Sequence, residues 1–264
     1  DNRKEGLTMN QSEKRLFLIQ SLLAERPSCQ KQMIPADSER QKILLRGLMN
    51  VRRAYPIGTK FLQIQDEYLQ GETAAKGVTD VADLTPIQPG LYLWQGDITT
   101  LKCDAIVNAC NSQMLGCFSP MHACNVIFIH TYAGVELRLK MHEIMAKQGH
   151  EEETGKAKIT SGYNLPAKYI LHTVGPIIQW KVTKEDEALL ASCYTECLKL
   201  AADTGVESIA FCCLSTGVFR FPQQRAAEIA TNTVKQYLNK DSRIKKVIFN
   251  VFKDEDLKIY NGLL

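Results

Sequence analysis

The chain has 264 residues, 45% of them hydrophobic, and its formal net charge at pH 7 is +3. This length allows a substantial buried core, and we expect one large domain with an extension. The nearly balanced charge gives no reason to expect a sequence-specific nucleic acid as partner, and no apolar run approaches the ~20 residues of a membrane span. Because the start also lacks the apolar core of a signal peptide, we expect a cytoplasmic protein. We also expect it to be a monomer.

Residues 1 to 88 are predicted to form a helical extension that carries no catalytic constellation. A first helix is capped by Ser12 and ended by Pro27. A second helix opens at Ser38, which has the capping-box pattern with the glutamine three residues later. A third helix covers residues 61 to 69, where apolar residues recur at helical spacing.

Three basic residues of this extension, Arg52, Arg53 and Lys60, are interpreted as part of a solvated face and not as a group that faces a ligand. Two prolines and a glycine between residues 86 and 90 then mark a boundary. A second domain is predicted from residue 89 to 264.

In this second domain strands alternate with helices. The predicted strands are Leu91 to Trp94, Ala105 to Val107, Ala157 to Thr160, Tyr169 to Val174, Ser208 to Leu214 and Lys246 to Phe252. The main helices run through residues 135 to 145, 183 to 204 and 222 to 238, and a short acidic helix ends the chain. Such alternation predicts an α/β fold with a mixed, largely parallel sheet covered by helices on both faces. Ligands of such sheets bind at the carboxyl ends of the strands.

A polar loop after the second of these strands holds Cys117, His122 and Cys124 in the spacing Cys-x4-His-x-Cys. Two thiolates and one imidazole could bind a single zinc ion and leave one tetrahedral position open, which is more typical of a catalytic than of a structural site. The alternative is two buried thiols and a surface histidine, since free cysteine is often buried. The cysteines in the predicted strands and helices are expected to be reduced core residues.

Two further loops could hold parts of a nucleotide. The small residues of Ser215 to Phe219 follow a buried strand and precede a helix, so their backbone N–H groups could converge on a phosphate. Asp97, at the end of the first strand, could accept a hydrogen bond from an exocyclic amine such as that of adenine. Taken alone, the first pattern is at least as typical of an ordinary turn, and Asp97 is more typical of a turn or cap residue.

Four motifs together resemble those of the macrodomains, the ADP-ribose-binding fold. They are GDIT (Gly96 to Thr99), VNACNS (Val107 to Ser112), HTVGP (His172 to Pro176) and STGVFRFP (Ser215 to Pro222). The segment GCFSPMHAC and the helical extension are similar to those of the zinc-containing macrodomains, protein-ADP-ribose hydrolases often encoded beside a sirtuin-type ADP-ribosyltransferase. The resemblance covers Arg15 to Leu264 and implies a three-layer α/β/α macrodomain with a mixed central sheet.

The resemblance implies a residue for every part of ADP-ribose. Asp97 and the backbone of Ile98 read the adenine, and Phe252 contacts the adenine or the proximal ribose. The turn wraps the diphosphate, with Phe219 against the distal ribose, and Asn111 hydrogen-bonds the hydroxyls of that ribose. The implied ligand-binding residues are Asp97, Ile98, Asn111, Ser215, Thr216, Gly217, Val218, Phe219 and Phe252.

For catalysis the resemblance implies Cys117, His122, Cys124 and Asn111, with Zn²⁺ on the first three beside the distal ribose. Zinc can polarise a ribose oxygen or lower the pKa of a bound water toward ~7. The implied reaction removes mono-ADP-ribose from an acidic side chain of a modified protein, with a lipoyl-carrier-like protein as one candidate partner.

The chain departs from the family pattern at two places in the site. Val126 and Ile127 stand where family members have Asp-Asn, and Arg220 replaces a glycine of the phosphate turn. The first change removes a carboxylate and an amide that could support the metal or act as a base. Two alternatives therefore stay open: a non-catalytic reader of ADP-ribose with zinc in a structural role, and an ordinary macrodomain on which the metal is only a structural clip.

Overall fold

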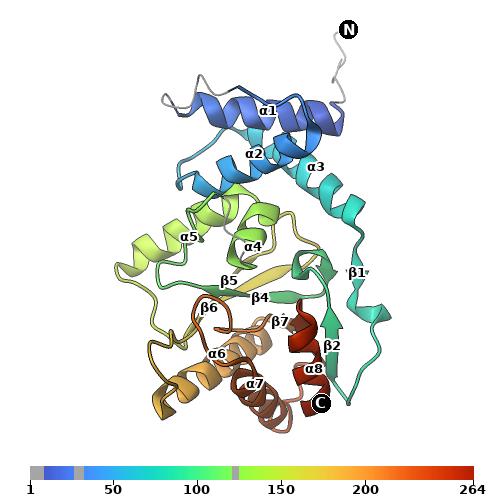
Figure 1. Ribbon diagram of the computed structural model, residues 1–264, viewed down its shortest axis with the longest axis vertical. Helices are drawn as coiled ribbons and strands as arrows, with labels where there is room; N and C mark the ends of the chain where they lie inside the picture. Colours follow the sequence, from blue (N-terminus) through green and yellow to red (C-terminus); the bar gives the residue numbers. More distant parts are fainter. Residues whose placement is uncertain (1–8, 27–32, 121–124) are drawn as a thin grey trace.

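The computed structural model describes residues 9–26, 33–120 and 125–264 (Figure 1). The described helices are α1 (Gln11–Ala24), α2 (Ser38–Val51), α3 (Thr59–Lys76), α4 (Asn125–Ala133), α5 (Val135–Gln148), α6 (Lys184–Asp203), α7 (Gln223–Leu238) and α8 (Asp254–Leu263), with short 3₁₀ turns η2 (Val81–Asp83) and η3 (Ile98–Thr100). The strands are β1 (Thr79–Asp80), β2 (Leu91–Gln95), β3 (Leu101–Lys102), β4 (Ala105–Cys110), β5 (Ala157–Ser161), β6 (Tyr169–Val174), β7 (Ser208–Phe211) and β8 (Lys246–Val251).

Six strands form the central sheet in the order β2-β8-β7-β4-β6-β5. Every pair is parallel except β5 with β6, which is antiparallel. The central strands β4 and β7 are almost entirely buried, which accounts for their continuous apolar runs. The predicted mixed, largely parallel sheet is thereby confirmed, and β4 continues past the predicted end at Val107 to Cys110.

Helices cover both faces of the sheet, as predicted. In Figure 1, α4 and α5 lie on one face and α6, α7 and α8 on the other. The main core contains the inward residues of the strands together with these helices. Among the described helices, none has both the length and the apolar character needed to cross a membrane.

The helices α1, α2 and α3 stack on the outer side of the α4 and α5 layer (Figure 1). Their apolar faces form a second core, which includes Leu18, Ile19, Leu45, Phe61 and Tyr68. This second core also contains Val135 from α5, so it extends into the α/β part of the chain. The division at residue 88 stays a prediction, and β1, which precedes it, pairs with β3, which follows it.

The helix caps of the extension differ from the predicted ones. The cap of α1 is Asn10 and not Ser12: the Asn10 side chain accepts the backbone N–H of Glu13, and the Glu13 carboxylate accepts that of Asn10. The cap of α2 is Asp37 and not Ser38. In both cases a preceding Asn or Asp, which is at least as good a cap as serine, fits the position better.

Candidate functional site

The loops that carry the predicted ligand residues meet at one edge of the sheet. Because β2, β4, β6, β7 and β8 are parallel, their carboxyl ends lie on the same side. The loop after β2 is tied to the end of β8, since Gly96 N–H donates to the Val251 carbonyl at 3.0 Å. The fold therefore brings together the loops that follow these strands, as the sequence predicted.

The adenine end of the expected site is centred on Asp97, which caps η3. Its Oδ1 accepts the N–H of Thr99 at 3.0 Å and the Thr99 hydroxyl at 2.6 Å. Its Oδ2 accepts Nζ of Lys76, the last residue of α3, at 3.0 Å, and this ammonium also lies 3.6 Å from the centre of the Tyr132 ring. Burial raises the pKa of Asp97, but the hydrogen bonds from Thr99 and Lys76 outweigh it, so the net pKa is lowered and the carboxylate is charged.

The other adenine candidates differ in exposure. Ile98 is buried, and Phe252, just after β8, leaves 74% of its surface exposed. The Phe252 carbonyl accepts the side-chain amide of Gln95 at 3.1 Å, which fixes this loop beside the end of β2. A largely exposed aromatic ring at this place is available to stack on a flat ligand.

The turn from Ser215 to Phe219, which is predicted to hold the diphosphate, has a tight backbone. Ser215 has a φ of +63°, and its carbonyl accepts the N–H of Phe221 at 3.0 Å. The Ser215 Oγ is buried and has no hydrogen-bond partner within the described part of the chain. A Cβ on Gly175 would lie 2.0 Å from this oxygen, so any larger residue there would require the Ser215 hydroxyl to move.

Arg220 also has a left-handed backbone, with a φ of +61°. Glycine adopts such a conformation without strain, which gives the physical reason for the glycine that the family has here. The Arg220 side chain is exposed and borders an open groove of about 410 Å³. The groove is lined by Ile177, Ile178, Gln179, Trp180, Val218 and Arg220.

The loop after β4 is ordered by its own polar side chains up to Cys117. Asn111 Oδ1 accepts the Met114 N–H at 3.1 Å, and Asn111 Nδ2 donates to the Gly116 carbonyl at 3.1 Å. Met114 and Gly116 have φ values of +57° and +81°, so the chain turns sharply here. The amide predicted to bind the distal ribose is thus held by this turn, and Cys117 follows it directly, half-buried.

Of the three predicted zinc ligands, the structure describes Cys117. His122 and Cys124 lie outside the described residues, as do the side chains of Val126 and Ile127. Within the described part, no group of three His, Cys, Asp or Glu side chains could hold a metal. A thiolate is a donor that zinc favours, so Cys117 fits the expected chemistry, and the full ligand set stays a prediction.

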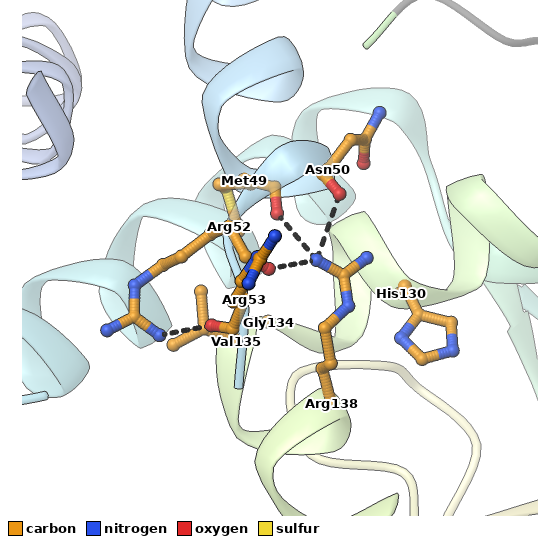
Figure 2. Close-up of a pocket in the computed structure, with 8 residues that line it drawn as sticks. All are labelled: Met49, Asn50, Arg52, Arg53, His130, Gly134, Val135 and Arg138. Carbon is orange, nitrogen blue, oxygen red and sulfur yellow. Dashed lines mark hydrogen bonds between the residues drawn. The ribbon is translucent and has the colours of Figure 1, made fainter. Parts of the chain in front are cut away.

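One group that the sequence analysis missed lies beneath this loop. Figure 2 shows Arg138 of α5 lining a cavity of about 10 Å³ and pointing at the end of α2. Its Nη1 donates to the carbonyls of Met49 at 3.2 Å and Asn50 at 2.9 Å, and also to that of Arg52. Burial lowers the pKa of Arg138 to about 10, so the guanidinium stays charged at neutral pH. No pattern along the chain connects positions so far apart.

His130 of α4 lines the same cavity (Figure 2). Both ring nitrogens are buried and lack a hydrogen-bond partner within the described residues. Burial, together with the charge of Arg138, lowers the pKa of His130 well below its ordinary value. The ring is therefore neutral, and a Cβ on Gly116 would lie 3.1 Å from it, so the loop packs directly on His130.

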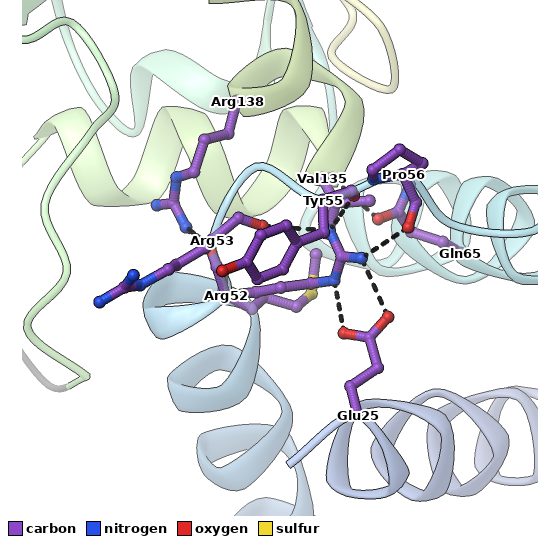
Figure 3. Close-up of polar contacts among 9 residues, drawn as sticks. Glu25, Arg52, Arg53, Tyr55, Pro56, Gln65, Val135 and Arg138 are labelled. Atoms are coloured by element: carbon purple, nitrogen blue, oxygen red, sulfur yellow. Dashed lines mark hydrogen bonds and ion pairs between the residues drawn. The ribbon is translucent and has the colours of Figure 1, made fainter. Parts of the chain in front are cut away.

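The interpretation of Arg52 as a solvated residue is wrong. Figure 3 shows its guanidinium facing Glu25 at the end of α1. Its Nε and Nη2 donate to the two Glu25 oxygens at 2.7 and 2.9 Å, its Nη1 donates to the Tyr55 carbonyl at 2.8 Å, and only 5% of the residue is exposed. Its partner lies 27 positions earlier in the chain, so no local pattern could indicate the pairing. Arg53 and Lys60 are exposed, as predicted.

The sequence matches the family model described as Macro domain over residues 107–230. Two relatives are similar over nearly their whole lengths. A protein of Treponema medium named protein-ADP-ribose hydrolase is 55% identical over 260 residues, which cover 97% of this chain and all of the relative. A protein of the same name from Staphylococcus aureus (strain MRSA252) is 50% identical over 256 residues, or 96% of each chain.

Solved structures are similar as well. The Trypanosoma brucei macrodomain in complex with ADP-ribose has a TM-score of 0.65 and 27% identity, covering 87% of this chain and 96% of that one. A point mutant of the Oceanobacillus iheyensis macrodomain with ADPR has a TM-score of 0.61 and 37% identity, covering 68% of this chain and 94% of that one. The alignment with the Oceanobacillus iheyensis structure covers a smaller share of this chain than the alignments with the two relatives named protein-ADP-ribose hydrolase.

Proposed function

Because the chain belongs to the macrodomain family, we propose that it is a hydrolase that removes mono-ADP-ribose from modified protein side chains, with acidic side chains as the substrate class. The relatives that are 50 and 55% identical over nearly their full lengths carry the name protein-ADP-ribose hydrolase, which supports the reaction. The similar structures with bound ADP-ribose support the ligand.

The observation that carries this proposal is the meeting of five loops at one sheet edge, from the Asp97 carboxylate to Cys117. In this arrangement Asp97 would accept the adenine amine, and the backbone N–H groups of the turn from Ser215 to Phe219 would hold the diphosphate. Phe219, half-buried on that turn, would contact the distal ribose. The reacting end of the ligand then lies toward the loop of Cys117.

We also propose that the enzyme is of the zinc-containing type, with Cys117, His122 and Cys124 as ligands. Zinc bound there would supply a Lewis acid for a ribose oxygen or a water of lowered pKa. The protein residues hold the sugar in place, and the hydrolysis of an acidic-residue ester adds water across the bond between carboxyl and ribose. The products are the free carboxylate and ADP-ribose.

The test uses a protein that carries mono-ADP-ribose on acidic side chains. The wild-type enzyme is expected to remove the whole modification, seen by intact mass spectrometry as loss of the ADP-ribose mass and by release of free ADP-ribose. Cys117→Ala and His122→Ala are each expected to reduce the rate by about 100-fold or more, because changes to mere hydrogen-bond partners of metal ligands already cost about 10- to 100-fold, while calorimetry still detects ADP-ribose binding.

Three results would count against this proposal. Binding of ADP-ribose without release of the modification by the wild type would support the non-catalytic reader. Undiminished hydrolysis by both variants, or in protein shown by metal analysis to be free of zinc, would exclude the metal role. A metal-free protein that unfolds, together with a metal ion that already has four protein ligands in the metal-loaded form, would indicate the structural clip.

A further inference from the structure

The loop segment that contains Cys117 is held by one side chain of the extension, Asn50 of α2, and one of the α/β part, Arg138 of α5. Two of its backbone carbonyls, those of Leu115 and Pro120, lie on either side of Cys117 and accept hydrogen bonds from side chains near the end of α2. The donors are Arg138 for Leu115 and Asn50 for Pro120. The thiol therefore lies between two fixed points on the loop backbone.

Arg138 forms the first of these points. Its Nε donates to the Leu115 carbonyl at 2.7 Å, while its Nη1 donates to carbonyls at the end of α2, including that of Asn50 at 2.9 Å. The guanidinium carbon also lies 4.6 Å from the centre of the Phe118 ring. A charged donor at a helix C-terminus satisfies its last carbonyls, so one buried side chain joins α2 to both sides of Cys117.

Asn50, in the last turn of α2, forms the second point. It is 1% exposed, its Nδ2 donates to the Pro120 carbonyl at 3.2 Å, and its Oδ1 accepts the Thr131 hydroxyl from α4 at 2.8 Å. A Cβ on Gly47, one turn earlier, would lie 3.6 Å from Pro120, so the helix backbone also approaches the loop closely. A buried amide with both ends bonded has one orientation.

We propose that α2 of the N-terminal extension is part of the active site, with Asn50 and Arg138 as positioning residues that fix the backbone on both sides of Cys117. The importance of this role for catalysis rests on the proposed function, in which Cys117 takes part in hydrolysis. The claim that the two side chains hold the loop in place does not rest on it. Neither residue needs to touch the substrate.

The closing experiment compares Asn50→Ala with a matched control, Gln65→Ala. Gln65 is also a fully buried amide of the extension that accepts a hydrogen bond from the main domain, at the Val135 N–H. Within the described residues its side chain makes no hydrogen bond to the Cys117 loop. Asn50→Ala loses two contacts with the α/β part, to Pro120 and Thr131, whereas Gln65→Ala loses one, to Val135. The control therefore reports a general loosening between the extension and the α/β part, and the Pro120 contact is isolated by the aspartate variant described below.

The first readout is the rate at which N-ethylmaleimide modifies Cys117 in the full chain after treatment with a chelator, followed by peptide mass spectrometry. Buried Cys110 serves as the internal reference. Asn50→Ala is expected to raise the Cys117 rate about fivefold over Gln65→Ala, since a lost hydrogen bond shifts a local opening equilibrium by about that factor. Equal rates in the two variants would overturn the proposal.

Asn50→Asp separates the two bonds of Asn50 and keeps the test valid if the alanine variant does not fold. An aspartate can still accept the Thr131 hydroxyl, but it cannot donate to the Pro120 carbonyl. If the Pro120 contact holds the loop, the Asp variant reacts as fast as the Ala variant or faster. Wild-type reactivity in Asn50→Asp would contradict the proposed role of this contact.

The second readout is functional. Asn50→Ala is expected to retain zinc more weakly in competition with a chromophoric chelator and to lower kcat about tenfold, while ADP-ribose affinity stays within about twofold of wild type, as for a group that acts only on the reacting end. An equal loss of ADP-ribose affinity would indicate a general structural role. If the wild type does not hydrolyse the substrate but Cys117 is still alkylated faster in Asn50→Ala than in Gln65→Ala, the positioning role is supported and the proposed hydrolase activity is rejected.

Discussion

His172, the first residue of the HTVGP motif, is completely buried in β6. Its Nε2 lies 2.8 Å from the Thr160 hydroxyl and its Nδ1 lies 3.2 Å from the Asn108 amide on β4. Burial lowers the pKa of His172 to about 3, so the ring is neutral in the folded protein. This motif entered the sequence-based prediction only as part of the family resemblance, and the structure shows that His172 joins β6 to its neighbouring strands.

This burial predicts a loss of stability in mild acid. Below the ordinary pKa of about 6.5 the unfolded chain binds a proton that the folded His172 does not, so the free energy of unfolding falls as pH drops from about 6.5 toward 3. Between pH 7 and pH 5 the expected contribution is about 2 kcal/mol. His172→Gln should reduce this pH dependence, measured by urea unfolding at both pH values. An unchanged dependence in this variant would assign the effect to other groups.

Arg220 was identified from the sequence only as a departure from the family, and the structure adds its positive φ. Arg220→Gly is expected to raise the free energy of unfolding by up to about 1 kcal/mol, because glycine adopts this conformation without strain. Arg220→Val is expected to lower it by about 1 kcal/mol or more, since β-branched residues tolerate it least. Chemical denaturation measures the free energy of unfolding of both variants. Equal values would contradict this expectation and would mean that the turn adopts another backbone conformation when Arg220 is replaced.

At the scale of elements, the periodic patterns predicted most of the sheet and its covering helices, because burial on one face imposes a regular spacing. The strand β6 and the capped start of α6 at Thr183 agree with the prediction residue by residue. Contacts between elements were not predictable in this way. Arg52 reads as an exposed charge, and only the packing of α1 against α2 brings Glu25 to it.

The pair of Arg52 and Glu25 should contribute measurably to holding α1 and α2 together. Glu25→Gln is expected to lower the free energy of unfolding by about 1–3 kcal/mol, because it leaves a buried guanidinium without its counter-charge. Glu143→Gln, which removes an exposed pair with Lys140, is the control and should cost less than about 0.5 kcal/mol. Equal effects of the two changes in thermal or urea unfolding would contradict this difference.

For the whole molecule, the extension and the α/β part share a core at Val135 and polar contacts at Asn50 and Arg138. We therefore expect one cooperative unfolding transition. Both tryptophans, Trp94 and Trp180, lie outside the extension, so their fluorescence follows the α/β part, whereas far-ultraviolet circular dichroism follows all helices. The two denaturation curves should coincide, and an earlier loss of helical signal would show that the extension unfolds alone.

The candidate site also shows where prediction from sequence ends at this scale. Its loops were identifiable because short motifs sit at the ends of predicted strands, and a parallel sheet necessarily gathers those ends. The contacts of Asn50 and Arg138 with the Cys117 loop were not identifiable from the sequence, because they depend on how helices distant in the chain pack together. The contact of Lys76 with the carboxylate of Asp97, which brings the end of α3 to the site, was likewise not predictable from the sequence.

Of the two side chains that support the Cys117 loop, Arg138 lies within the family-matched region, residues 107–230, whereas Asn50 lies well before it. Transplanting only the cysteine-bearing segment into a macrodomain that lacks these helices would leave one end of it unsupported. A working graft would have to carry the last turn of α2 as well, so the unit that is exchangeable between such proteins is discontinuous in the chain.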